Sequence, residues 1–312
     1  MNYKAIIFYL GLFILPLSGM SFLNILYSTY FDYFLSIDSY TVTFFLSLGV
    51  GLFFCFYGKK STKKINFYEQ LFLIILVYLV SSLFIALPYY LSNYQITFLD
   101  SIFESFSGVT STGFSIFENI KYLDPTLILW RSSSQWIGGL YFFVFLIIIF
   151  SNNQYNFRLN HLVNTGDMGS FSKSNTKNII LQIFLVYSLL TLLIFVLLNF
   201  GNLRLFNSLN LSMTIVSNGG FLPTNSLNQI FSKDYYYILA IALLIPTLNI
   251  FFLFNFYSKK RIISLHQEDI FILVFISTLA LIMFYTLSSN SISEVIINIV
   301  TSISNSGISF SK

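Results

Sequence analysis

The sequence predicts an all-α integral membrane protein with about seven transmembrane spans and three shorter helices that re-enter the membrane. Of its 312 residues, 56% are hydrophobic and only 9% are charged, which is too little polar surface to cover a soluble domain of this size. Apolar runs long enough to cross about 30 Å of hydrocarbon recur along the chain. Three of them are followed by a short string of small polar residues that ends in glycine.

The seven apolar runs lie at residues 5–27, 41–57, 68–91, 127–150, 178–200, 235–257 and 270–288. The first is too long for the apolar region of a signal peptide, and no small-residue cleavage site follows it. We therefore expect it to remain as a membrane helix.

Basic residues indicate the orientation, because loops rich in Lys and Arg resist translocation. If each run crosses once, eleven of the sixteen basic residues share one side: Lys4, Lys59, Lys60, Lys63, Lys64, Arg158, Lys173, Lys177, Lys259, Lys260 and Arg261. We therefore expect a cytoplasmic N-terminus. The three glycine-ended strings then lie at the extracytoplasmic face, since each follows an odd-numbered span.

These strings are residues 109–113, 216–220 and 303–307. Their last four residues, 110–113, 217–220 and 304–307, are here called the first, second and third glycine strings. Aligning their glycines places residues 101–114 over 208–221 and 295–308. In each copy about a dozen apolar and small residues precede the glycine, which predicts a short helix that enters the membrane part way and turns back. Non-helical backbone at that depth is tolerated only where protein buries it or where it lines a watery cavity.

The composition of the strings suits cation coordination by backbone carbonyls. Glycine adopts positive φ and adds no side chain, and the carbonyl ends of short helices favour positive charge. The candidate ion-binding residues are Thr110, Ser111, Thr112, Gly113, Ser217, Asn218, Gly219, Gly220, Ser304, Asn305, Ser306 and Gly307. The alternative is that the strings are tight extracellular turns or sites of close helix packing.

Three charged residues near the first string have two interpretations each. Asp100 and Glu104 lie one helical turn apart and are expected to concentrate cations at the outer mouth, although acids also favour a helix N-terminus on their own account. Arg131 begins the fourth span, where it is either functional or a snorkelling arginine of an interfacial aromatic belt.

Other classes of function find no support in the sequence. It has no Gly-x-Ser-x-Gly, Walker-type or His-Glu-x-x-His motif, so we predict no enzyme and no catalytic residue. Cys55 is the single cysteine, which leaves no disulfide framework or cysteine metal site, and no metal besides the transported ion is expected. The net charge of +4 is explained by loop topology, so nucleic-acid binding is not expected.

Several motifs together resemble the TrkH/KtrB family of bacterial potassium transporters. They are Phe103-Glu104-Ser105-Phe106-Ser107-Gly108-Val109-Thr110-Ser111-Thr112-Gly113, Leu129-Trp130-Arg131 and Gln135-Trp136-Ile137-Gly138-Gly139, with Ala86-Leu87-Pro88 and Asn218-Gly219-Gly220-Phe221 in support. The resemblance covers essentially the whole chain.

This resemblance implies a potassium-channel-like fold in which four helix, pore-loop, helix units surround one potassium pathway. Residues 1–66 would form two N-terminal helices, 67–150 the first pore unit, 177–257 the second and 268–312 an incomplete third unit. It also implies a homodimer in the bacterial inner membrane, in contact with lipid, on a TrkA/KtrA-like cytoplasmic ring of nucleotide-binding subunits. The basic loops near residues 59–64, 158–177 and 259–261 would be its docking surfaces.

The chain departs from the family pattern at its end. Lys312 lies five residues past Gly307, so the fourth unit is absent and we expect a truncated sequence, the alternative being that another polypeptide supplies the missing quarter. Potassium uptake is the leading hypothesis. A secondary carrier of another monovalent cation such as sodium, with the glycines as hinges, and a non-transporting membrane subunit or inactive fragment are the alternatives.

Overall fold

The structure, a computed structural model, describes residues 2–59, 65–150, 176–230, 235–247, 271, 274–279, 281–282 and 292–304. Helices make up nearly all of the regular structure, and the described residues include no strand. The chain divides into two compact units, Met1–Ile149 and Phe150–Lys312, each described by itself below.

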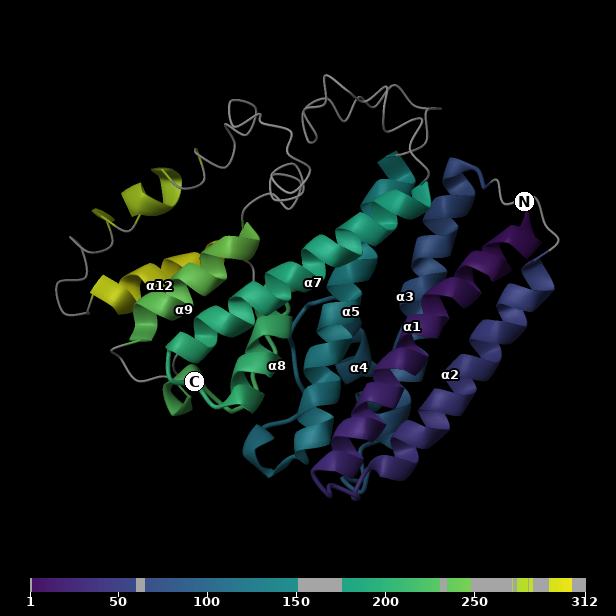
Figure 1. The fold of residues 1–312 in the computed structure, drawn as a ribbon, viewed down its shortest axis with the longest axis horizontal. Helices are drawn as coiled ribbons and strands as arrows, with labels where there is room; N and C mark the ends of the chain where they lie inside the picture. The colour runs from purple at the N-terminus through teal and green to yellow at the C-terminus, as the bar shows by residue number, and fades with distance from the viewer. Residues whose placement is uncertain are drawn as a thin grey trace. The chain divides into compact units, whose positions relative to one another are not determined.

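The first unit starts with an antiparallel hairpin of two long helices, α1 (Tyr3–Tyr30) and α2 (Ile37–Gly58), which lie side by side in Figure 1. Glycines allow this close approach. A Cβ on Gly11 would come within 2.7 Å of the carbonyl oxygen of Gly51, and one on Gly58 within 2.5 Å of that of Lys4. Small residues at helix contacts are how membrane helices pack when lipid removes the hydrophobic drive to associate.

Helix α2 shows why these helices suit a bilayer. Its buried face carries Thr43 and Ser47, whose hydroxyls donate to the carbonyls of Ser39 (2.8 Å) and Thr43 (2.6 Å) in the preceding turn. Its outer face carries Phe45 and Phe53, which are 69% and 63% exposed. A helix with satisfied hydroxyls inside and large apolar groups outside is stable where the surroundings are hydrocarbon.

The next helices of this unit are α3 (Phe67–Tyr90) and the short α4 (Phe98–Val109), which packs against α3. Glu69 ties the beginnings of α1 and α3 together, because its carboxylate accepts the backbone N–H groups of Asn66 (2.8 Å) and Asn2 (2.5 Å). The start of α1, the end of α2 and the start of α3 therefore share one end of the unit.

Helix α5 (Pro125–Phe150) is the centre of the first unit, since it is bonded to all four other helices. The Tyr141 hydroxyl donates to the Phe13 carbonyl in α1. The Tyr40 hydroxyl in α2 donates to the Thr126 hydroxyl (3.3 Å). The Trp130 indole N–H donates to the Ile85 carbonyl in α3 (3.0 Å). The contacts with α4 are ionic and steric, and they position the candidate site.

The second unit contains α7 (Thr176–Phe200), α8 (Leu205–Val216), α9 (Tyr236–Leu244) and α12 (Ile292–Ile303). The short α8 packs against α7, and α12 packs against α9 (Figure 1). The described residues also include three short 3₁₀ turns, at Ile120–Tyr122, Leu227–Gln229 and Ile245–Thr247.

Five of the seven expected spans are confirmed as helices long and apolar enough to cross a membrane: α1, α2, α3, α5 and α7. Of the sixth, residues 235–247 are described, as α9 and the 3₁₀ turn that holds Pro246, and residues 248–257 lie outside the described part. The seventh, 270–288, is described only in fragments.

Candidate functional site

Three helices of equal length precede the three glycine strings. Helices α4, α8 and α12 each have 12 residues and end at Val109, Val216 and Ile303. In every copy the string begins at the next residue and its glycine is four residues past the helix end. The repeat that the sequence predicts is therefore present in the helices, with the same register.

The first string leaves α4 through a fixed set of backbone hydrogen bonds. The N–H groups of Thr110, Ser111 and Thr112 donate to the carbonyls of Phe106 (3.0 Å), Gly108 (2.9 Å) and Ser107 (2.9 Å). Ser111 and Gly113 have positive φ of 54° and 84°, whereas Thr110 (φ −86°) and Thr112 do not. The sign of φ thus alternates along the string.

The second string repeats this conformation in the other unit. The N–H groups of Ser217, Asn218 and Gly219 donate to the carbonyls of Met213 (3.3 Å), Ile215 (3.1 Å) and Thr214 (2.9 Å). Asn218 and Gly220 have φ of 53° and 80°, while Ser217 (φ −86°) and Gly219 do not have positive φ. Two segments that share only their last residue adopt one backbone.

An alternating backbone has a chemical consequence. When φ changes sign from residue to residue, the N–H groups turn to one side of the chain and the carbonyls to the other. Such a segment offers a row of oxygens of the kind that replaces the water around a cation. The left-handed conformation of Ser111 and Asn218 costs a non-glycine residue of order 1–2 kcal/mol, and strain of this kind is concentrated at functional sites.

The sequence predicts positive φ at the glycines of this conformation, Gly113 and Gly220, but not at Ser111 and Asn218. Asn218 carries a weak signal, since asparagine tolerates positive φ better than most residues. Ser111 carries none. Of the third string, Ser304 is described: it is buried, and its N–H donates to the Val300 carbonyl (2.8 Å). Asn305, Ser306 and Gly307 lie outside the described residues.

The structure separates the two acids expected at an outer mouth. Asp100 is exposed and belongs to the N-terminal cap of α4, where its N–H donates to the Thr97 hydroxyl (3.2 Å) and its carboxylate accepts from that hydroxyl (2.6 Å). Glu104 has no exposed surface. The expectation that Glu104 gathers cations at an open surface is therefore corrected, because its carboxylate is enclosed by protein.

Glu104 is paired with Arg131. The Arg131 Nε donates to Glu104 Oε1 over 2.8 Å, and the two side chains are 1% and 0% exposed. The Arg131 guanidinium also lies over the Phe117 ring, 5.4 Å from its centroid. Arg131 is thus no snorkelling residue: its charge is enclosed in the unit together with its counter-ion.

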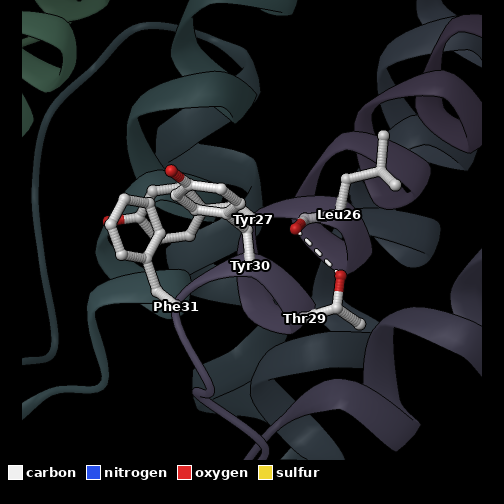
Figure 2. A pocket seen from close by; sticks show the side chains of 5 residues that line it. All are labelled: Leu26, Tyr27, Thr29, Tyr30 and Phe31. Carbon is white, nitrogen blue, oxygen red and sulfur yellow. Dashed lines mark hydrogen bonds between the residues drawn. The ribbon is translucent and has the colours of Figure 1, made fainter.

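A surface hollow at the end of α1 has a different character. Figure 2 shows Leu26, Tyr27, Thr29, Tyr30 and Phe31 around a space of about 540 Å³, with the Thr29 hydroxyl donating to the Leu26 carbonyl (3.0 Å). Tyr30 is 80% exposed, and the Tyr27 and Phe31 rings lie 4.7 Å apart. Exposed aromatic residues at a helix end are typical of the membrane interface, and the hollow offers no ring of oxygens to an ion.

Comparison with known proteins settles the family. The family model described as "TrkH: Cation transport protein" matches residues 39–308. The chain belongs to the TrkH family. This match confirms the resemblance read from the motifs.

Individual TrkH-type relatives agree. The Trk system potassium uptake protein TrkH of Salmonella typhimurium is 26% identical over 258 residues, 80% of this chain and 52% of that protein. An uncharacterized cation transporter of Methanocaldococcus jannaschii is 31% identical over 192 residues, 59% of this chain and 39% of that protein. This chain therefore spans about half or less of the length of these relatives.

The fold also matches a solved TrkH. The crystal structure of the potassium transporter TrkH from Vibrio parahaemolyticus aligns over 100% of this chain and 66% of that one, with a TM-score of 0.79 and 19% sequence identity. The predicted fold class, an all-α membrane protein, is confirmed by this match and by the five apolar helices.

Proposed function

We propose that this chain forms part of a pathway for potassium uptake across the bacterial inner membrane, in which backbone carbonyls of the glycine strings coordinate the ion. The observation that carries the proposal is the shared backbone of the first and second strings, with positive φ at Ser111 and Gly113 and again at Asn218 and Gly220. The left-handed residue that follows each helix is a common helix C-cap. The second positive φ, two residues later at Gly113 and Gly220, goes beyond that cap and recurs at the same position in both strings.

The coordinating groups in this proposal are neutral oxygens. Among the described residues there is no group of three or more His, Cys, Asp or Glu side chains that could hold a metal ion. Carbonyls supply oxygens without formal charge in the membrane, which suits a monovalent ion that must both enter and leave. Potassium is chosen because relatives such as the Salmonella protein are named as potassium uptake proteins.

The orientation of the chain sets the direction of transport. With a cytoplasmic N-terminus, the glycine strings face the outside, and an inside-negative potential drives cations inward with about 2.3 kcal/mol per charge for each 100 mV. The first three pore units are assigned to residues 67–150, 177–257 and 268–312, after an N-terminal pair of helices in 1–66. The ion-binding role of residues 304–307 rests on their register with the other two strings.

The proposal also includes protein partners of this chain. A second copy of the chain and a TrkA/KtrA-like cytoplasmic ring would assemble with it, and the basic loops near 59–64, 158–177 and 259–261 would face that ring. Removal of these loop charges is expected to weaken binding of the ring without altering ion selectivity, because the charges lie on the cytoplasmic side.

Growth of a bacterial strain without its own potassium uptake tests the proposal. The gene for this chain, carried with its genomic flanking sequence, is expected to restore growth at low potassium and to support uptake of rubidium. Gly113→Ser is expected to weaken the preference for potassium over sodium. Failure of the unmutated gene to support uptake, with the protein present in the membrane, would instead favour a non-transporting subunit.

A further inference from the structure

A buried polar cluster lies behind the first glycine string and connects the chain before the string with the chain after it. Glu104, on α4, provides the central carboxylate. Its Oε1 accepts Arg131 Nε (2.8 Å) and the Ser115 hydroxyl (3.1 Å), and its Oε2 accepts the backbone N–H of Ile116 (2.9 Å). Donors therefore come from α5 and from the segment that follows Gly113.

Ser115 makes the cluster continuous. Its hydroxyl oxygen accepts from Arg131 Nη2 (2.9 Å) and from the backbone N–H of Phe117 (3.1 Å), while it donates to Glu104. Ionised carboxylate accepts at both oxygens, and the guanidinium supplies the counter-charge that makes burial of that carboxylate tolerable. Residues 115–117 are thus bonded to one enclosed ion pair.

The result is a chain that is held on both sides of Gly113. Before this glycine, the Thr112 N–H is bonded to the Ser107 carbonyl of α4 (2.9 Å). After it, the Ile116 N–H is bonded to Glu104, which lies on the same helix. Gly113 lies between these two attachments, so contacts with α4 on both sides restrain the end of the first string.

The second string has the same backbone but the chemistry of this cluster is absent there. The repeat offset of 107 residues between Gly113 and Gly220 places Leu211 at the position of Glu104 and Pro223 at that of Ile116. Leu211 is buried and has no polar atom in its side chain to accept a hydrogen bond. Pro223 has no backbone N–H to donate. Acceptor and donor have both been replaced, so these two positions of the second string cannot form the bond between Glu104 and Ile116.

We infer that Glu104 is a positioning residue for ion discrimination: with Arg131 and Ser115 it holds the first glycine string in the conformation that prefers potassium over sodium. This inference rests on the proposed function of the strings. Potassium and sodium carry the same charge, so discrimination between them depends on the positions of the coordinating oxygens. A string that loses one of its attachments adapts to the smaller sodium ion. The first string is then a rigid part of the pathway wall.

Two variants and one matched control test the inference. Glu104→Gln keeps the shape of the side chain but removes the charge that pairs with Arg131, and Ser115→Ala removes the connecting hydroxyl without leaving a buried charge unpaired. The control, Asp38→Asn, makes the matching change from acid to amide at an exposed carboxylate in the first turn of α2. The measurement is the ratio of potassium to sodium transport in membranes that contain equal amounts of each protein.

Glu104→Gln is expected to lower this ratio about tenfold, and Ser115→Ala by a smaller factor, as for contacting residues in one hydrogen-bond network. Asp38→Asn is expected to leave the ratio unchanged. A role limited to folding would lower the amount of protein and leave the ratio intact. An unaltered ratio in Glu104→Gln overturns the inference, and where that variant does not accumulate, an unaltered ratio in Ser115→Ala does so.

Hydrogen–deuterium exchange separates this inference from the proposed function. In the unmutated protein the amides of residues 116 and 117 are expected to exchange slowly, and Glu104→Gln is expected to accelerate them, whereas Asp38→Asn is not. Accelerated exchange in a protein that carries no potassium would leave the cluster in place and refute the transport function. Unchanged exchange in Glu104→Gln would refute the cluster even if transport is normal.

Discussion

Gly138 of α5 lies directly against the carbonyl group of Val109, the last residue of α4. A Cβ on Gly138 would overlap both the oxygen and the carbon of that carbonyl. The neighbour is backbone, which cannot rotate away as a flexible side chain can. Helix α5 therefore determines where α4 ends, and with it where the first glycine string begins.

Substitution Gly138→Ala is expected to displace the end of α4 or to separate it from α5. Overpacking of this kind typically costs about 1–3 kcal/mol, and cation uptake is expected to fall with it because the first string moves. The measurement is the thermal midpoint of the purified protein together with rubidium uptake.

Gly49→Ala is the matched control for this change. Gly49 lies in α2, and a Cβ there would meet nothing within 4 Å. Alanine is expected to raise the stability of that helix by up to about 1 kcal/mol, since glycine is the poorer helix former. Equal effects of Gly138→Ala and Gly49→Ala would contradict the contact with Val109.

The two glycines with positive φ, Gly113 and Gly220, are expected to respond alike to alanine. At φ of 84° and 80° a Cβ is strained whatever space surrounds it, with a cost of roughly 1–2 kcal/mol per residue. Each variant is expected to lose discrimination between potassium and sodium, measured as the ratio of the two uptake rates. A loss confined to Gly113→Ala would show that the second string does not contact the ion.

Ser111→Gly is expected to raise the stability of the protein, whereas alanine at Gly113 or Gly220 is expected to lower it. Ser111 has φ of 54°, and its buried hydroxyl has no hydrogen-bond partner among the described residues. Glycine removes the strain and the unsatisfied hydroxyl, and this gain is offset in part by the entropy that glycine has in the unfolded chain. We expect a stability change between zero and about 1 kcal/mol in favour of the variant. A clear loss of thermal stability would mean that the Ser111 hydroxyl has a partner of its own.

The contrast between Ser111 and the two glycines shows which parts of the conformation the sequence alone predicts. Repeat spacing predicts the helices α4, α8 and α12 and the two glycines that need positive φ, because both follow from local sequence. The positive φ of Ser111 has no local signal. It is imposed by the hydrogen bonds that the string makes with the end of α4.

The misplacement of Glu104 has a similar cause. Its distance from Asp100 in the sequence suggests one acidic surface, but burial is decided by Arg131, which lies 27 residues further along the chain. One signal was available: an acid and an arginine, each in strongly apolar surroundings, both require a partner, and each is the obvious partner of the other. Trp130, beside Arg131, is fully buried and bonded to Ile85, so it does not mark a membrane interface.

Potassium itself is expected to stabilise the protein if the glycine strings bind it. A ligand that binds only the folded state adds stability by mass action, about 2.7 kcal/mol when its concentration is one hundred times its dissociation constant. The thermal midpoint is therefore expected to rise more in potassium chloride than in sodium chloride at equal ionic strength, with choline chloride as the reference that no ring of oxygens would bind. Gly113→Ala is expected to reduce the difference between potassium and sodium, because it changes the coordinating oxygens. Gly49→Ala is expected to preserve the difference, because it changes only an exposed helix surface. Equal midpoints in potassium and sodium for the unmutated protein would contradict selective binding, and a difference that survives in Gly113→Ala would place the ion away from the first string.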